Sequence, residues 1–306
     1  MNPTDTSSLP LRQPLRFTLP LGSRLALLLC IWLVCMIITS VAVYVLSRNG
    51  LTVPGIRVAT VLQDVMMFIF PAILTALLVT RRPAELLCID YFPRRPLTYL
   101  LPILALIASI PAMNSLISWN EGISLPSSMA GIEEWMRTSE ENAAQMIKLL
   151  TGGDTVGSLI MSILIVGIFA GVSEELLFRG SIQRLLTTGG LNHHASIWIT
   201  AFIFSAIHMQ FFGFFPRLAL GAFFGYLLYW TGSLWIPIII HALNNTIVVV
   251  SMWYDNSHRV IGENGEEIIG NSPIESYGND SPLLIILSLA AVALLIAAIR
   301  HQRIRE

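Results

Sequence analysis

The sequence predicts an all-α fold: a polytopic membrane helix bundle of about eight transmembrane helices, with both termini in the cytoplasm. Hydrophobic residues make up 54% of the 306 residues, and charged residues only 12%. That charged share is about half of the roughly 25% found in soluble domains. The apolar residues also gather in runs of about 20, the length at which a helix crosses a bilayer. A net charge of -1 without a basic tract gives no reason to expect a nucleic-acid partner.

The expected spans follow from these apolar runs. The first run, of about 22 residues, is too long for a signal-peptide core, so we expect an uncleaved span there. The fourth contains charged residues, so its later part is expected to break or to leave the membrane. Short turns join the fifth, sixth and seventh spans, which should therefore be antiparallel neighbours. In order, the spans are Leu25–Leu46, Val58–Thr80, Leu97–Ile117, Thr155–Leu186, Ala195–Phe212, Phe215–Thr231, Leu234–Trp253 and Pro282–Ile299.

The placement of charged residues predicts the orientation of the bundle. Arginines lie in the N-terminal tail, in the connection after the second span and in the C-terminal tail, whereas acidic residues gather in segments 118–154 and 254–281. Since cytoplasmic loops carry an excess of basic residues, both termini are expected on the cytoplasmic side. The acidic segments are then extracytoplasmic.

The chain divides into five parts on this basis. We expect a cytoplasmic tail (1–24), three spans with an extracytoplasmic loop (25–154), a core of four spans (155–253), an acidic loop (254–281) and a last span with a basic tail (282–306). Apolar positions at helical spacing predict an amphipathic helix over Ile132–Leu150. This helix is expected either on the membrane surface or packed against loops of the bundle.

Two adjacent acids, Glu174 and Glu175, interrupt the apolar fourth span. An acidic residue at the bilayer centre costs roughly 2.5–3.5 kcal/mol, so such a pair must be compensated or used. Glu175 and Arg179 are four residues apart and can pair on one helix face. Glu174 is rotated by about 100° from Glu175, so it can face another space and act as a general base.

Two histidines lie in later spans: His208 in the fifth, and His241 in the seventh, four residues before Asn245. At about 1.5 Å per residue, one cavity can hold both histidines and Glu174. This set suits hydrolysis without a covalent intermediate. The carboxylate and one histidine can deprotonate water, while the other histidine and the asparagine donate to the oxyanion. A lone membrane histidine, however, is often only a hydrogen-bonded helix contact.

Other residues in the apolar runs receive structural interpretations. Asp64 is expected near the outer end of the second span, in contact with water. Gly221 and Gly225 form a G-x-x-x-G pair that favours close helix packing. His193 and His194 are expected in a solvated turn. No G-x-S-x-G motif is present and neither Cys30 nor Cys35 lies near the polar set, which disfavours a serine or cysteine nucleophile.

Three motifs, taken in order, resemble the CPBP family. They are Glu174-Glu175-x-x-x-Arg179, Phe204-x-x-x-His208 and His241-x-x-x-Asn245. The family contains type II CAAX prenyl endopeptidases and the Abi bacteriocin-processing or self-immunity proteins. The similarity runs from about Thr155 to Val250 and includes the segment Thr231–Trp235 before the last motif.

This resemblance implies an intramembrane glutamic endopeptidase, a hydrolase that needs no metal or other cofactor. By this likeness Glu174 would activate water with the help of His208, and His241 with Asn245 would form the oxyanion site. Glu175, Arg179 and Phe204 would support that geometry. The expected partner is a peptide or membrane-protein substrate, with or without a lipid modification, and the expected location is a bacterial inner membrane.

Two other interpretations stay open from the residues. Glu174, His208 and His241 could instead hold a catalytic zinc ion, since two histidines and a glutamate are a known zinc set. Alternatively, the chain could be a transporter or an immunity protein without enzymatic activity, because intramembrane ionisable residues also mark ion pathways.

Overall fold

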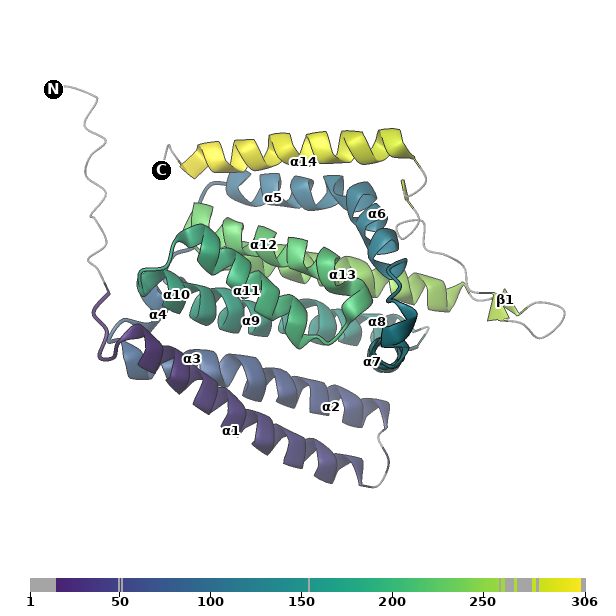
Figure 1. Ribbon diagram of the computed structural model, residues 1–306, viewed down its shortest axis with the longest axis horizontal. Helices are drawn as coiled ribbons and strands as arrows, with labels where there is room; N and C mark the ends of the chain where they lie inside the picture. The colour runs from purple at the N-terminus through teal and green to yellow at the C-terminus, as the bar shows by residue number, and fades with distance from the viewer. Residues whose placement is uncertain are drawn as a thin grey trace.

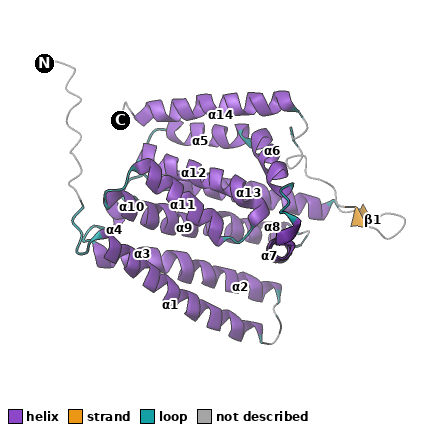
Figure 2. Cartoon of the chain, in the orientation of Figure 1, coloured by secondary structure: helices purple, strands orange, loops and turns teal. Residues whose placement is uncertain are grey.

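The computed structural model describes residues 15–48, 50, 52–153, 155–258, 260–261, 267–268, 277–278 and 281–303. Helices dominate these residues, as the sequence predicts (Figure 2). Two short strands, β1 (Val260–Ile261) and β2 (Glu267–Ile268), pair antiparallel. Most of the expected N-terminal tail, most of the acidic loop and the last three residues lie outside the described residues.

The long helices lie side by side in one bundle, and α1 begins at the same end at which α14 finishes (Figure 1). Six helices are long and apolar enough to cross a membrane, and a bent pair raises this to as many as seven. The chain is therefore an integral membrane protein, while a total of eight spans stays a prediction. The helices that pass this test, alone or joined, are α1 (Leu21–Ser47), α2 (Val53–Asp64) with η1 (Val65–Ile69) and α3 (Phe70–Val79), α5 (Leu97–Ala108) with α6 (Ile110–Glu121), α8 (Val156–Ser162) through α10 (Arg184–Thr188), α12 (Phe214–Thr231) with η5 (Phe211–Gly213), α13 (Trp235–Ser257) and α14 (Pro282–Arg303).

The third expected span is broken rather than straight. Its halves α5 and α6 meet at an angle of 47°. Pro111 follows the break closely, and a proline cannot donate the backbone hydrogen bond that would continue a helix. At the break, the hydroxyl of Ser109 donates to the carbonyl of Leu106 at 2.7 Å. This bend directs α6 away from the line of α5.

The fourth expected span does not break, and the alternative, that its later part leaves the membrane, stays a prediction. Residues Val156–Thr188 form one continuous helical segment of 33 residues. It alternates α-helical and π-helical turns: η3 (Ile163–Phe169) precedes α9 (Ala170–Glu175), and η4 (Leu176–Gln183) follows it. Neighbouring helices bury two of its charged residues, Glu175 and Arg179. Short π-helical stretches often accompany functional sites.

The fifth expected span is shorter than predicted. α11 (His193–Ile207) ends before His208, which is its C-cap residue. The next residue, Met209, has a φ of 54°, and a right-handed helix cannot continue through this left-handed conformation. The turn that follows is held by Asn120 of α6. Its side chain donates to the carbonyl of Phe211 at 3.0 Å and accepts from the amide of Phe215 at 2.9 Å.

The predicted amphipathic helix is present as α7 (Ala130–Thr151). It packs against the helices α2, α8, η5 and α13 rather than against loops alone, and its position on the membrane surface stays a prediction. The Trp135 ring lies 5.1 Å from that of Phe211. Arg137 donates to the Glu133 carboxylate at 2.6 Å, and this bond lowers the pKa of Glu133. Two connecting turns are also helical, α4 (Pro83–Leu86) and η2 (Ser127–Met129).

The predicted close packing at the two glycines of α12 is confirmed. A Cβ atom on Gly221 would meet that of Ala201 at 3.2 Å, and one on Gly225 would meet the Ile197 side chain at 2.9 Å. The absence of side chains lets α11 and α12 approach each other. It also exposes backbone carbonyls of α12 to polar groups on the fourth span.

Candidate active site

Glu175 and Arg179 form the buried ion pair that their spacing predicts. Both side chains are fully buried, and Arg179 Nη1 lies 2.6 Å from Glu175 Oε1. Arg179 Nη2 also donates to the carbonyl of Gly221 at 2.9 Å. Its guanidinium lies 4.5 Å from the centre of the Phe204 ring. The charge of Glu175 is therefore compensated inside the bundle.

His241 joins this pair from α13. Its Nδ1 lies 2.8 Å from Glu175 Oε1, so a proton on that nitrogen is donated to the carboxylate. The ring stacks on Phe224 at 4.7 Å and meets the Phe204 ring at 85°. These contacts fix the ring and direct Nε2 toward Glu174, whose Oε2 is 3.7 Å away.

His208 is oriented in a similar way. Its Nδ1 lies 2.7 Å from the carbonyl of Phe204, which leaves Nε2 for other contacts. The Phe204 ring packs between the two histidines, 5.0 Å from His208 and 5.8 Å from His241. Glu174 is close enough to act electrostatically on His208. The side chain of Glu174 is 14% exposed, in contrast to that of Glu175.

Asn245 lies one helical turn beyond His241, but its contacts are different. Its Nδ2 donates to the carbonyl of Val166 at 3.3 Å, and its Oδ1 accepts from Asn244 at 3.3 Å. The structure thus brings five candidate residues into one cluster, and Asn245 lies at its edge. The five are Glu174, Glu175, Arg179, His208 and His241.

Two charged residues near Glu174 were missed as site residues from the sequence. Asp64 is only 4% exposed, so the expectation that it touches water is wrong. It ends α2, which packs against α9, and it is close enough to interact electrostatically with Glu174. Arg217 of α12 also acts on Glu174, while its Nη2 donates to Gln210 at 2.7 Å. Charged residues inside apolar runs were the available signal for both.

The described residues do not form a metal site in this geometry. Among them, no group of three or more His, Cys, Asp or Glu side chains is arranged to hold an ion. The Nδ1 atoms of both histidines face protein acceptors. These contacts do not involve Nε2 of either ring, and Nε2 of His241 lies 3.7 Å from Glu174 Oε2.

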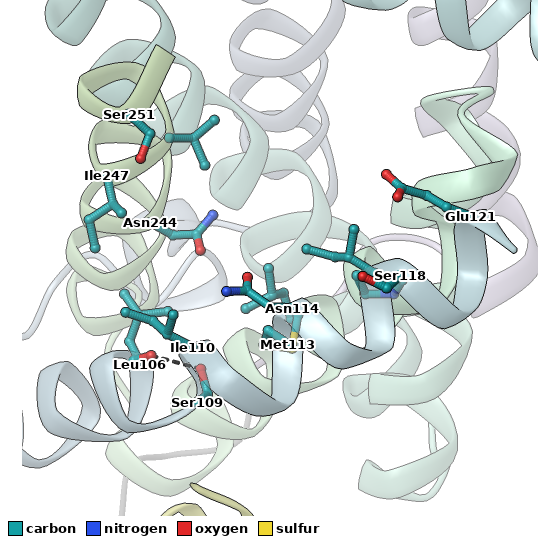
Figure 3. Close-up of a pocket in the computed structure, with 14 residues that line it drawn as sticks. Leu106, Ser109, Ile110, Met113, Asn114, Ser118, Glu121, Asn244, Ile247 and Ser251 are labelled. Atoms are coloured by element: carbon teal, nitrogen blue, oxygen red, sulfur yellow. Dashed lines mark hydrogen bonds between the residues drawn. The ribbon is translucent and has the colours of Figure 1, made fainter. Parts of the chain in front are cut away.

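A cavity of about 530 Å³ lies beside α13, where the bend between α5 and α6 leaves space (Figure 3). Leu220, Ile247 and other apolar side chains form much of its wall. The amides of Asn114 and Asn244 face each other across it (Figure 3). Since Asn244 also donates to Asn245, this cavity is connected by a hydrogen bond to the edge of the polar cluster.

The segment that carries most of these residues is similar to known proteins. Residues 156–247 match the family model of type II CAAX prenyl endopeptidases, Rce1-like. Over 104 residues, 33% of this chain, the sequence is 24% identical to the uncharacterized protein YpbD of Bacillus subtilis (strain 168). The aligned part spans 50% of that protein. No solved structure matches. The family resemblance inferred from the three motifs is confirmed for this segment.

Proposed function

We propose that this chain is an intramembrane endopeptidase of the glutamic type. Its residues 156–247 match the family model of type II CAAX prenyl endopeptidases, and the members of that family are proteases. The observation that carries the proposal is the position of Glu174 relative to His241. Their facing atoms are 3.7 Å apart, too far for a good direct hydrogen bond. The separation leaves room for the two oxygens of a tetrahedral intermediate, with the attacking oxygen beside Glu174 and the former carbonyl oxygen beside His241.

Glu174 acts as the general base in this mechanism. It removes a proton from water, helped by Nε2 of His208, and the resulting hydroxide attacks the scissile carbonyl carbon. When the tetrahedral intermediate collapses, the C–N bond breaks and Glu174 returns the proton to the leaving amine. A partly exposed carboxylate suits this role better than the buried, arginine-bound Glu175.

His241 and Asn245 stabilise the oxyanion. To donate from Nε2, His241 must carry a proton there in addition to the one that Glu175 accepts at Nδ1. Two carboxylates, Arg179 and a doubly protonated His241 then give the cluster no net charge, which suits a site inside the membrane. Asn245 uses one N–H for Val166 and has a second to offer. Such a donor typically contributes about 2.7–4 kcal/mol to the transition state.

We favour a mechanism without a metal. The arrangement of the described residues supports this, because they form no three-ligand group around Glu174. A water activated by a carboxylate and a histidine needs no Lewis acid. The zinc interpretation with Glu174, His208 and His241 stays testable by metal analysis.

The substrate is an apolar peptide or membrane-protein segment, with or without a lipid modification. The cavity beside α13 supports this class, because the amides of Asn114 and Asn244 can pair with peptide groups while the surrounding walls accept apolar side chains. We also propose that both termini are cytoplasmic and that the membrane is a bacterial inner membrane. The arginines near both ends of the chain support this orientation, because cytoplasmic segments carry an excess of basic residues.

Substrate trapping tests this function. The full-length Glu174→Gln variant is purified from membranes, and bound peptides are identified by mass spectrometry. The wild-type protein should cleave the trapped peptides, and Glu174→Gln should not. Glu134→Gln, at an exposed acid on α7, serves as the control and should cleave normally. Equal cleavage by wild type and Glu174→Gln would refute the proposal.

A further inference from the structure

A second cavity, of about 330 Å³, lies at the end of the bundle where α11 begins and α14 finishes. It is far along α11 from His208, which caps the opposite end of that helix. Its lining comes from three helices: His194 of α11, Tyr226, Tyr229 and Trp230 of α12, and Arg300 of α14. His193 and His194 are exposed, as expected, but they form the first turn of α11, and their rings contact Tyr226 and Tyr229.

The chemistry of this lining suits an anion. Every lining side chain has an N–H or O–H to donate, two are basic, and none is acidic. His194 Nδ1 lies 2.8 Å from the hydroxyl of Tyr226, and the ring of Tyr226 stacks on Trp230 at 5.2 Å. Arg300 makes no ion pair with any acid in the part of the chain that the structure describes. A guanidinium beside several donors matches the oxygens of a phosphate group.

An apolar stripe runs from the cavity along α11 toward the membrane interior. His194, Trp198 and Phe202 are four residues apart, so they share one face of the helix. Trp198 is 49% and Phe202 56% exposed, so both present apolar surface beyond the protein's own packing. A ligand with a phosphate head and an acyl chain would contact the cavity and this stripe together.

We propose that this cavity binds the phosphate group of an anionic glycerophospholipid, with one acyl chain along Trp198 and Phe202. Basic pockets between transmembrane helices bind lipid headgroups in this way. Bound lipid would link α11, α12 and α14 at this end of the bundle. The site is separate from the proposed catalytic cluster and does not depend on the proposed function.

Native mass spectrometry of the full chain in detergent tests the proposal. Dioleoyl phosphatidylglycerol is the probe, dioleoyl phosphatidylcholine the zwitterionic comparison and inorganic phosphate the free anion. Arg300→Gln and His194→Gln should each weaken phosphatidylglycerol binding by about tenfold, the usual effect of losing a charge-assisted hydrogen bond. Arg81→Gln removes an exposed arginine at the same end of the bundle without touching the cavity, and should bind like wild type.

Other outcomes would overturn the proposal. Unchanged binding by both Arg300→Gln and His194→Gln would show that the cavity is not the site. An equal loss in Arg81→Gln would point to surface charge in general. Trp198→Ala separates a lipid from free phosphate, because it should weaken phosphatidylglycerol binding alone. If millimolar phosphate displaces the lipid completely and Trp198→Ala has no effect, the ligand is a free anion and the lipid assignment is wrong.

Discussion

Glu175 of α9 and His241 of α13 are joined by a buried hydrogen bond of 2.8 Å between Oε1 and Nδ1. The same oxygen also receives Arg179 at 2.6 Å. One carboxylate thus holds the fourth span's arginine and orients the histidine of another helix. This relationship divides the two adjacent glutamates, because Glu175 supports the structure while Glu174 is left at the edge of the cluster with partial exposure.

This division predicts that substitutions of the two glutamates differ in their effects on stability and on cleavage. Glu175→Gln leaves Arg179 buried without its charge partner, and breaking a buried pair costs about 3–5 kcal/mol. We expect a clear fall in melting temperature together with weakened cleavage. Glu174→Gln should abolish cleavage and leave the melting temperature close to wild type. Thermal unfolding in detergent and cleavage of a trapped peptide measure the two effects. Equal destabilisation by both variants would contradict the division.

The close approach of α9 and α13 predicts a second effect, at Gly171. A Cβ atom there would lie 3.0 Å from the amide nitrogen of Ala242 and 3.1 Å from its Cα. These are backbone atoms that cannot rotate away, so Gly171→Ala must shift α13 and with it the adjacent His241. The contacts require a shift of only a few tenths of an ångström. Since misplacement of a reacting group by about 1 Å can cost 10²-fold in rate, we expect Gly171→Ala to lower the rate of peptide cleavage by less than that.

Gly157→Ala is the matched control for this change. A Cβ atom at Gly157, on the same long helical segment, meets nothing within 4 Å. It should keep full cleavage, since alanine favours a helix over glycine by about 1 kcal/mol. Normal cleavage by Gly171→Ala would show that α13 tolerates the shift and that the position of His241 is not critical.

Much of this fold could be predicted from the sequence because it depends on local patterns. Apolar runs predicted the helices, and the i,i+4 spacing predicted the pair of Glu175 and Arg179. The end of α11 could not be predicted, because it is set by the φ of Met209 and by the distant side chain of Asn120. Asp64 was misplaced for a related reason, since its burial depends on which helices pack against α2.

The donor arrangement predicts that metal is not required. Purified protein should contain no stoichiometric zinc by elemental analysis, and cleavage should persist after treatment with a chelator. The physical reason is that the described carboxylates and histidines near Glu174 do not form a three-ligand group. Loss of cleavage on chelation, with recovery when zinc is returned, would favour the zinc interpretation with Glu174, His208 and His241.

The last prediction concerns Asp64, a buried acid whose Oδ2 has no hydrogen-bond partner among the described residues. Burying a polar group without a partner costs about 1–3 kcal/mol. Asp64→Leu should therefore raise the melting temperature. We expect it to lower cleavage as well, because Asp64 interacts electrostatically with Glu174. Opposite changes in stability and activity are typical of a residue kept for function.

Thr39→Val provides the comparison that separates these two effects. Thr39 of α1 is also buried, and its hydroxyl likewise lacks a partner among the described residues. Its helix, α1, packs mainly against α3, η1 and α2 rather than against α9, which carries Glu174. Thr39→Val should therefore raise the melting temperature and keep full cleavage. If Asp64→Leu behaves in the same way, the acid has no part in the reaction. If Asp64→Leu unfolds the protein, the buried Asp64 carboxylate is stabilising. The unpartnered Oδ2 then does not cost the protein stability.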